Sequence, residues 1–168
     1  MKNIFRTILF LLVVSPISLF GQIKFGHINS NELLSKMPKV IEAKKKIEEL
    51  GKSYEDQLKE LRSEYDKKLA AYQAGQATWP EATRKSKETD LLQLQERMQS
   101  FNQTANEDIQ KKQEEYLSPI VNQVKEAIKA IAKEGKYAYI FDSGVGSVLY
   151  AQESDDITPL VKKKLGLE

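Results

Sequence analysis

The stretch AYQAGQATWPEATRK, residues 71–85, interrupts a charged run that otherwise has the pattern of a helix from about residue 38 to about residue 134. Gly75 stands where the C-terminus of a helix favours a residue that tolerates the left-handed backbone conformation. We therefore expect the first helix to end close to Gly75.

A second helix is predicted to start directly after this stop. Thr78 and Glu81 have the spacing of a capping box, in which each side chain bonds to the backbone of the other residue, and Pro80 suits a first helical turn. So short a connection returns the chain antiparallel. The sequence thus predicts one helical hairpin, residues 38–134, with its tip near residues 74–79.

Apolar residues in both arms of this hairpin follow an 11-residue repeat. In the first arm they are spaced 3, 4, 4, 3, 4, 4 and 3 apart: Ile47, Leu50, Tyr54, Leu58, Leu61, Tyr65, Leu69 and Tyr72. In the second arm two series share the period: Leu94, Ala105, Tyr116 and Ala127, and Met98, Ile109, Ile120 and Ile131. About 3.67 residues per turn keeps such a stripe on one side of a nearly straight helix. Two arms with one period are predicted to stay in contact along their length.

The sequence before the hairpin predicts a strand and a short helix. IKFGHI, residues 23–28, is rich in apolar and β-branched residues, and Asn29 follows it as a helix cap with Glu32 three residues on.

The sequence after the hairpin holds two further β-rich runs, Tyr137 to Phe141 and Ser147 to Ala151, around a glycine turn. A last helix is predicted after them, capped by Asp155 or Asp156 and ended by Gly166.

Together these segments predict an α+β fold in a single domain, residues 22–168. The hairpin would rise from a small β body made of residues 22–37 and 135–168. Three short strands and one small helix cannot cover their own apolar side chains, so we expect the body to pair with other copies of the chain. The side chains predicted to hold that assembly are Phe25, Tyr139, Phe141, Val148 and Tyr150.

The first residues have the architecture of a secretory signal. Lys2 and Arg6 precede an apolar run, residues 8–14, which Pro16 cuts short of the roughly 20 residues that a membrane span needs. We expect export and removal of residues 1–21, by cleavage near Gly21 or Gln22.

Charge and composition exclude several classes of function. Cleavage removes two of the 26 Lys and Arg but none of the 24 Asp and Glu, so the formal net charge falls from +2 to 0. A neutral chain is not expected to bind nucleic acid strongly. The absence of cysteine excludes disulfides, thiol catalysis and thiolate metal sites. His27, the only histidine, lies in a predicted strand without the partners that a metal site or a catalytic triad requires. We expect no cofactor and no enzyme activity.

The order of IKFGHIN, the charged hairpin turning at QAG, then YAYIFDSG, VLYA and DDIT resembles the Skp/OmpH family of periplasmic chaperones. The resemblance implies a trimer whose β body carries three hairpins as tentacles around a cavity. It also implies an ATP-independent holdase whose partners are unfolded outer-membrane β-barrel proteins. The best-known members are strongly basic, so the neutral charge of this chain leaves contact with lipopolysaccharide or membrane open.

Two residues near the tip are candidates for client contact in such a protein, Tyr72 and Trp79. Trp79 either clasps the turn against Tyr72 or lies exposed and touches a client. Two alternatives lack chaperone activity altogether: a structural coiled-coil protein of the envelope, and the helical hairpin of a periplasmic pump adaptor.

Overall fold

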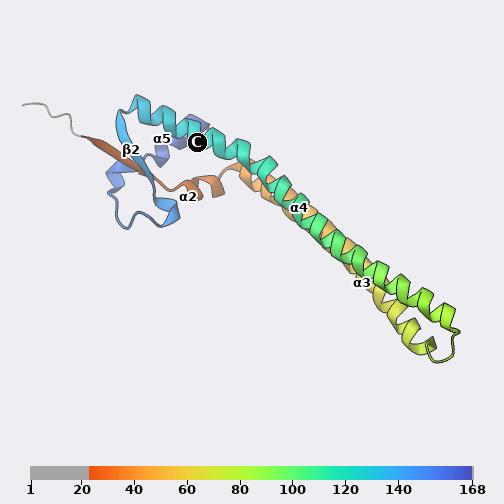
Figure 1. The fold of residues 1–168 in the computed structure, drawn as a ribbon. Coiled ribbons are helices and arrows are strands. Elements are labelled where there is room, and N and C mark those ends of the chain that lie inside the picture. The colour runs from red at the N-terminus through yellow and green to blue at the C-terminus, as the bar shows by residue number, and fades with distance from the viewer. Residues whose placement is uncertain (1–22, 168) are drawn as a thin grey trace, which may run out of the picture.

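The computed structural model describes residues 23–167, so the predicted signal peptide, residues 1–21, lies outside the described residues. The elements are β1 (Lys24–Ile28), α2 (Ser30–Ser35), α3 (Pro38–Gly75), α4 (Glu81–Glu134), β2 (Tyr137–Asp142), the 3-10 turns η1 (Ser143–Val145) and η2 (Glu153–Asp155), and α5 (Thr158–Leu165). Helices α3 and α4 form a long hairpin that projects from a small body built of the other elements (Figure 1). The predicted α+β fold with an antiparallel helical hairpin is confirmed. Within the described range, none of the helices combines the length and the apolar character of a membrane span.

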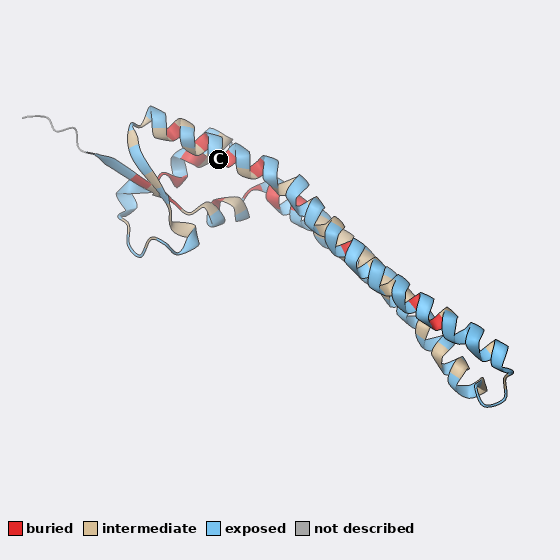
Figure 2. Ribbon diagram, viewed as in Figure 1, coloured by how far each residue is buried: buried red, intermediate tan, exposed pale blue. Residues whose placement is uncertain are grey.

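The 11-residue repeat is the line of contact between the two arms. All eight stripe residues of α3 are half-buried, and on α4 Leu94 and Ala105 are buried while Met98 and Ile109 are half-buried. Figure 2 shows exposed residues over most of the rest of the hairpin. Glu42 and Lys46, at 2.7 Å, and Glu64 and Lys68, at 3.2 Å, pair one turn apart on these exposed faces. Each arm therefore buries one stripe and leaves its other faces in water.

Two tyrosines of the stripe fix the register of the arms. The Tyr54 hydroxyl donates to Asp108 Oδ2 at 2.8 Å, and this hydrogen bond raises the pKa of Tyr54. The Tyr72 hydroxyl donates in the same way to Glu88, which raises the pKa of Tyr72. Because each tyrosine reaches a carboxylate of the opposite helix, a slip of one turn would break both bonds.

The turn between the arms differs from the predicted capping box. The start of α4 has Pro80 as its N-cap residue, with no capping side chain. The Thr78 hydroxyl instead donates to the Gly75 carbonyl at 3.0 Å, and the backbone N–H groups of Thr78 and Trp79 donate to the same oxygen. The prediction was wrong because the Thr78 hydroxyl bonds to the last carbonyl of α3 and therefore does not cap the start of α4.

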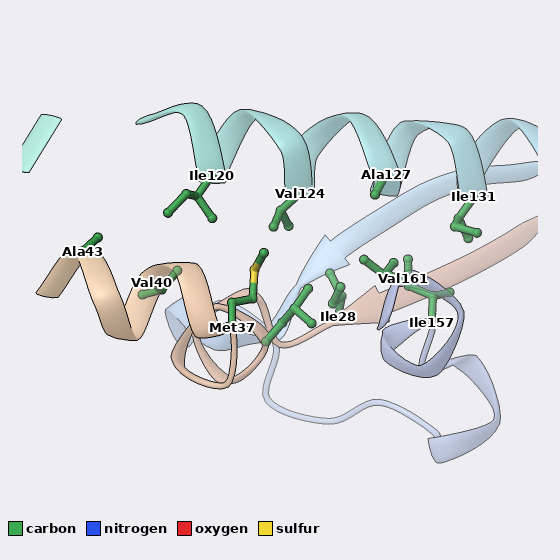
Figure 3. Close-up of a cluster of buried hydrophobic side chains, with 11 residues drawn as sticks. Ile28, Met37, Val40, Ala43, Ile120, Val124, Ala127, Ile131, Ile157 and Val161 are labelled. Carbon is green, nitrogen blue, oxygen red and sulfur yellow. The ribbon is translucent and has the colours of Figure 1, made fainter. Parts of the chain in front are cut away.

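The core of the body lies where the base of the hairpin meets the sheet and α5. Figure 3 shows Val40 of α3 facing Ile120 and Val124 of α4, with Ile157 and Val161 below Ile131. The same cluster contains Ile28, Leu33, Met37, Ala43 and Ala127. The hairpin and the body thus share one apolar core.

The sheet of the body joins the segments that precede and follow the hairpin. β1 and β2 run parallel, with Phe25 opposite Tyr139 and His27 opposite Phe141. The predicted Asn29 cap is confirmed, since its side chain accepts the Glu32 N–H at 2.9 Å. A parallel pair needs a long crossover connection, and here the entire hairpin is that connection.

The last helix begins and ends close to the predicted points. Asp156 Oδ1 accepts the Thr158 N–H at 2.8 Å, although the N-cap residue itself is Ile157. Gly166 is left-handed with φ of 68°, as a C-terminal glycine was expected to be.

The second β-rich run, Ser147 to Ala151, is not a strand in the structure. Leu149 and Tyr150 are 98% and 82% exposed, and Val148 is half-buried. The only pairing beyond the two strands in the described residues is a single bridge between His27 and Asp156. The prediction was wrong for one chain because a strand needs a neighbour for its backbone groups, and this segment lies beside none.

Candidate functional site

Three aromatic rings form a ladder on the outer face of the β1–β2 sheet. The ring centroids of Phe25 and Tyr139 are 6.0 Å apart, and Phe141 lies 6.2 Å from each. Side chains of a strand alternate between faces, so these residues point outward while Ile28 points into the core. All three rings are between 45% and 62% exposed. Stacked apolar rings left in water are typical of a surface that another protein covers.

The structure brings together three of the five predicted assembly residues. Phe25, Tyr139 and Phe141 form the ladder, whereas Val148 and Tyr150 lie on the unpaired segment after η1. Among the described aromatic side chains, Tyr150 forms no ring contact with the ladder. The role of all five residues in assembly stays a prediction.

The predicted glycine turn after β2 is anchored by Asp142, a residue that the sequence did not single out. Asp142, at the end of β2, accepts hydrogen bonds from the Ser30 N–H at 3.2 Å, from the Ser30 hydroxyl and from the Gly144 N–H at 2.8 Å. Asn31 adds a bond to the Gly144 carbonyl at 2.8 Å. Burial acts to raise the pKa of Asp142, but these donors outweigh it and the pKa is lowered. DSGVG is thus a turn that ties β2 to the start of α2.

His27 also connects parts of the body. Its Nε2 lies 2.9 Å from the Gln152 carbonyl, and its own carbonyl accepts the Ile157 N–H at 2.9 Å. Nδ1 is buried without a partner in the described residues. Across residues 23–167, no cluster of three His, Cys, Asp or Glu side chains is placed to hold a metal ion. The contacts of His27 that the structure shows are structural.

The tip of the hairpin is closed by aromatic packing. The rings of Tyr72 and Trp79 meet edge to face, 6.2 Å between centroids, and both residues are half-buried. A Cβ added to Gly75 would stand 2.2 Å from the Trp79 ring. Gly75 is therefore required because any larger side chain would clash with the indole ring of Trp79. Its predicted left-handed conformation is wrong, because α3 continues through this residue. Trp79 thus packs against Tyr72 and closes the turn. Client contact at the tip stays a prediction.

Comparisons with known proteins agree with this architecture. The family described as "Outer membrane protein (OmpH-like)" matches residues 24–165. A relative from Yersinia enterocolitica named "Chaperone protein Skp" is 25% identical over 142 residues, which cover 84% of this chain and 85% of the relative. A protein of the same name from Pectobacterium atrosepticum is 22% identical over 155 residues, covering 92% and 93%.

A solved structure shares the fold. The crystal structure of an OmpH-like chain from Caulobacter crescentus CB15 superposes with a TM-score of 0.72 at 15% identity, covering 85% of this chain and 83% of that one. The predicted resemblance is confirmed over nearly all of the described residues.

Proposed function

This chain belongs to the OmpH-like family, and on that premise we propose that it is an ATP-independent periplasmic holdase for unfolded outer-membrane β-barrel proteins. The observation that carries the proposal is the division of the fold into a long two-helix arm and a small body with an exposed aromatic ladder. The names of two relatives, both chaperones, support the same class of activity. We assign no catalytic residue.

The arms supply the surface that a holdase needs. Each arm exposes charged and polar side chains beside a half-buried apolar stripe, so a client chain would meet many weak contacts along it. Binding the unfolded state lowers its free concentration, and aggregation slows because exposed apolar segments stop meeting each other.

The aromatic ladder is proposed to hold a homotrimer. Phe141 is 48% exposed in one chain, and a second copy that covered it would remove apolar surface from water. The segment Ser147 to Ala151 could gain its missing strand neighbour in the same contact. Three hairpins would then stand around a common space in which a client is kept apart from other clients.

The trimer is tested by Phe141→Asp. A charge buried without a partner costs several kcal/mol, so we expect this variant to sediment as a monomer while the wild type sediments as a trimer. Ile41→Asp is the matched control, because Ile41 is 56% exposed on α3, away from the ladder. A trimeric Phe141→Asp variant would place the interface elsewhere.

The holdase activity is tested by aggregation. An outer-membrane β-barrel protein is diluted from urea without ATP, and light scattering is followed with and without the mature chain. We expect light scattering to fall as the concentration of the mature chain is raised. Unchanged scattering would favour the structural coiled-coil alternative.

The periplasmic location is tested by mass spectrometry of the cell-envelope fraction. We expect an N-terminus near Gly21 or Gln22. Recovery of residues 1–21 on membrane-bound protein would contradict export with cleavage.

A further inference from the structure

A groove lies between the two arms, about halfway along the hairpin. It has a volume of about 690 Å³, within the roughly 300–1,000 Å³ of ligand pockets in general. Its floor is made of three half-buried stripe residues, Leu58 and Tyr65 of α3 and Met98 of α4. Each of these side chains is half-buried, so part of its surface stays accessible from the groove.

The α4 wall of the groove consists of amide side chains. Gln95, Gln99 and Asn102 are spaced four and three residues apart, which places them on one face of the helix. They belong to residues 91–106, where Glu96 and Arg97 are the only charged residues, whereas 30% of the whole chain is charged. Six amides fall in this stretch: Gln93, Gln95, Gln99, Asn102, Gln103 and Asn106.

The wall amides have free hydrogen-bonding capacity. Within residues 23–167, Gln95 and Gln99 form no side-chain hydrogen bond, and Asn102 uses only its oxygen, which accepts from Asn106 at 2.9 Å. An amide offers two N–H donors and a carbonyl acceptor. An extended backbone presents the same two kinds of group, and in an unfolded chain they have no protein partner.

The α3 wall of the groove favours neither positively nor negatively charged ligands. It carries Glu55 and Asp66 together with Lys59 and Arg62, two groups of each sign. Neither an acidic nor a basic ligand would be favoured as a whole, and an uncharged segment would meet no uncompensated charge.

We propose that this groove binds an extended, uncharged segment of an unfolded polypeptide. Alternate apolar side chains of the segment lie on Leu58, Tyr65 and Met98, and its backbone N–H and C=O groups bond to the amides of Gln95 and Gln99. The strands of a transmembrane β-barrel have such a sequence, since apolar and polar residues alternate along them. The inference rests on the proposed holdase function and moves the client contact from the tip, where Trp79 is engaged with Tyr72, to the middle of the arm.

The probe is a synthetic peptide with blocked ends and dansyl label, in which Val and Tyr alternate with Ser and Thr. Its binding to the intact mature protein is measured by fluorescence anisotropy. A second peptide of the same sequence carries methyl groups on alternate backbone nitrogens and has lost those donors. We expect the methylated peptide to bind about tenfold more weakly, because it cannot donate to the amide oxygens.

Two variants test the residues themselves. Gln95→Ala with Gln99→Ala removes the wall, and both positions are exposed, so the fold should persist. We expect about tenfold weaker peptide binding. Gln110→Ala with Gln113→Ala, two exposed amides of α4 outside the groove, should bind as the wild type does. Met98→Glu should weaken peptide binding, because it places a charge in the apolar floor of the groove. Leu92→Glu, at an exposed apolar site outside the groove, should leave binding unchanged.

The outcomes separate this inference from the function on which it rests. Wild-type protein that fails to suppress aggregation contradicts the holdase proposal, and the inference falls with it. Suppression by the wild type, with groove variants that bind peptide as tightly as their controls, overturns the groove alone. Peptide binding that weakens as the protein is concentrated would show that a second copy covers the groove and would also overturn the proposal.

Discussion

The body and the arm bury their apolar residues to different depths. In the body Leu33, Ile157 and Val161 are fully inaccessible to water, whereas the stripe residues of α3, such as Leu61, are only half-buried and Leu94 of α4 is still 6% exposed. Two helices that touch along one line enclose few side chains completely, whereas several elements packed around one point can enclose many. The body is thus built for stability and the arm for exposed length.

Leu33→Ala tests the depth of the body core and should have the largest effect. The side chain is fully buried, and truncation of such a leucine leaves a cavity. We expect a loss of about 3 kcal/mol in the free energy of unfolding, measured by urea denaturation. A loss below about 1 kcal/mol would mean that the body is as loosely packed as the arm.

Gly75→Ala tests the close approach at the tip. The new Cβ would stand 2.2 Å from the Trp79 ring, so the clasp must open at a cost of about 1–3 kcal/mol. The emission of this single tryptophan should shift to longer wavelength as the indole meets water. Adding Trp79→Ala removes the clash, so the double variant should lose no more stability than Trp79→Ala alone. Additive losses would show that Gly75 is needed for another reason.

Leu61→Ala tests how strongly the packing between the arms contributes to stability, for comparison with Leu33→Ala in the body. The side chain is half-buried, so the expected loss is about 1 kcal/mol. Far-UV circular dichroism during urea titration measures it. An effect equal to that of Leu33→Ala would contradict the difference in depth between arm and body.

Asp142 gives the smallest expected effect, and that effect depends on pH. Its pKa is lowered in the folded state, so the folded protein binds fewer protons than the unfolded chain at acid pH. The contribution is complete above the usual aspartate pKa of about 3.9 and is lost as the pH falls through the lower pKa of the folded state. Asp142→Asn should flatten the acid limb of stability against pH. Glu48→Gln, at an exposed position on the arm, is the control and should leave that limb unchanged.

These differences in depth also explain what could be predicted from the sequence. The hairpin followed from the 11-residue repeat, because burial on one side of a helix leaves a period in the sequence. The Asn29 cap and Gly166 followed from local backbone chemistry, which acts over three or four residues.

The failures came from side-chain contacts that the local pattern of residues does not reveal. Ser30 and Asp142 are 112 residues apart, and nothing in either neighbourhood indicates that they meet. At the tip, the Thr78 hydroxyl bonds to the Gly75 carbonyl instead of capping α4, and α3 continues through Gly75, on which Trp79 packs. The segment after η1 has strand composition without a strand partner in the single chain. Composition reports what a segment can form, and its neighbours decide whether it does.

The division of labour between arm and body is tested most directly by shortening the arm. In the register set by Tyr54 and Asp108, Leu58 and Asn102 line the same groove from opposite helices, so residues 59–101 can be replaced by a Gly-rich turn. The body core, Asp142 and the aromatic ladder stay intact. Light scattering of an unfolded β-barrel protein is then compared for the shortened and the full-length protein at equal chain concentration, with sedimentation as the check on assembly. We predict a shortened protein that is still trimeric and has lost most of its suppression of aggregation; a shortened trimer that suppresses as well as the full-length protein would contradict client holding by the arms.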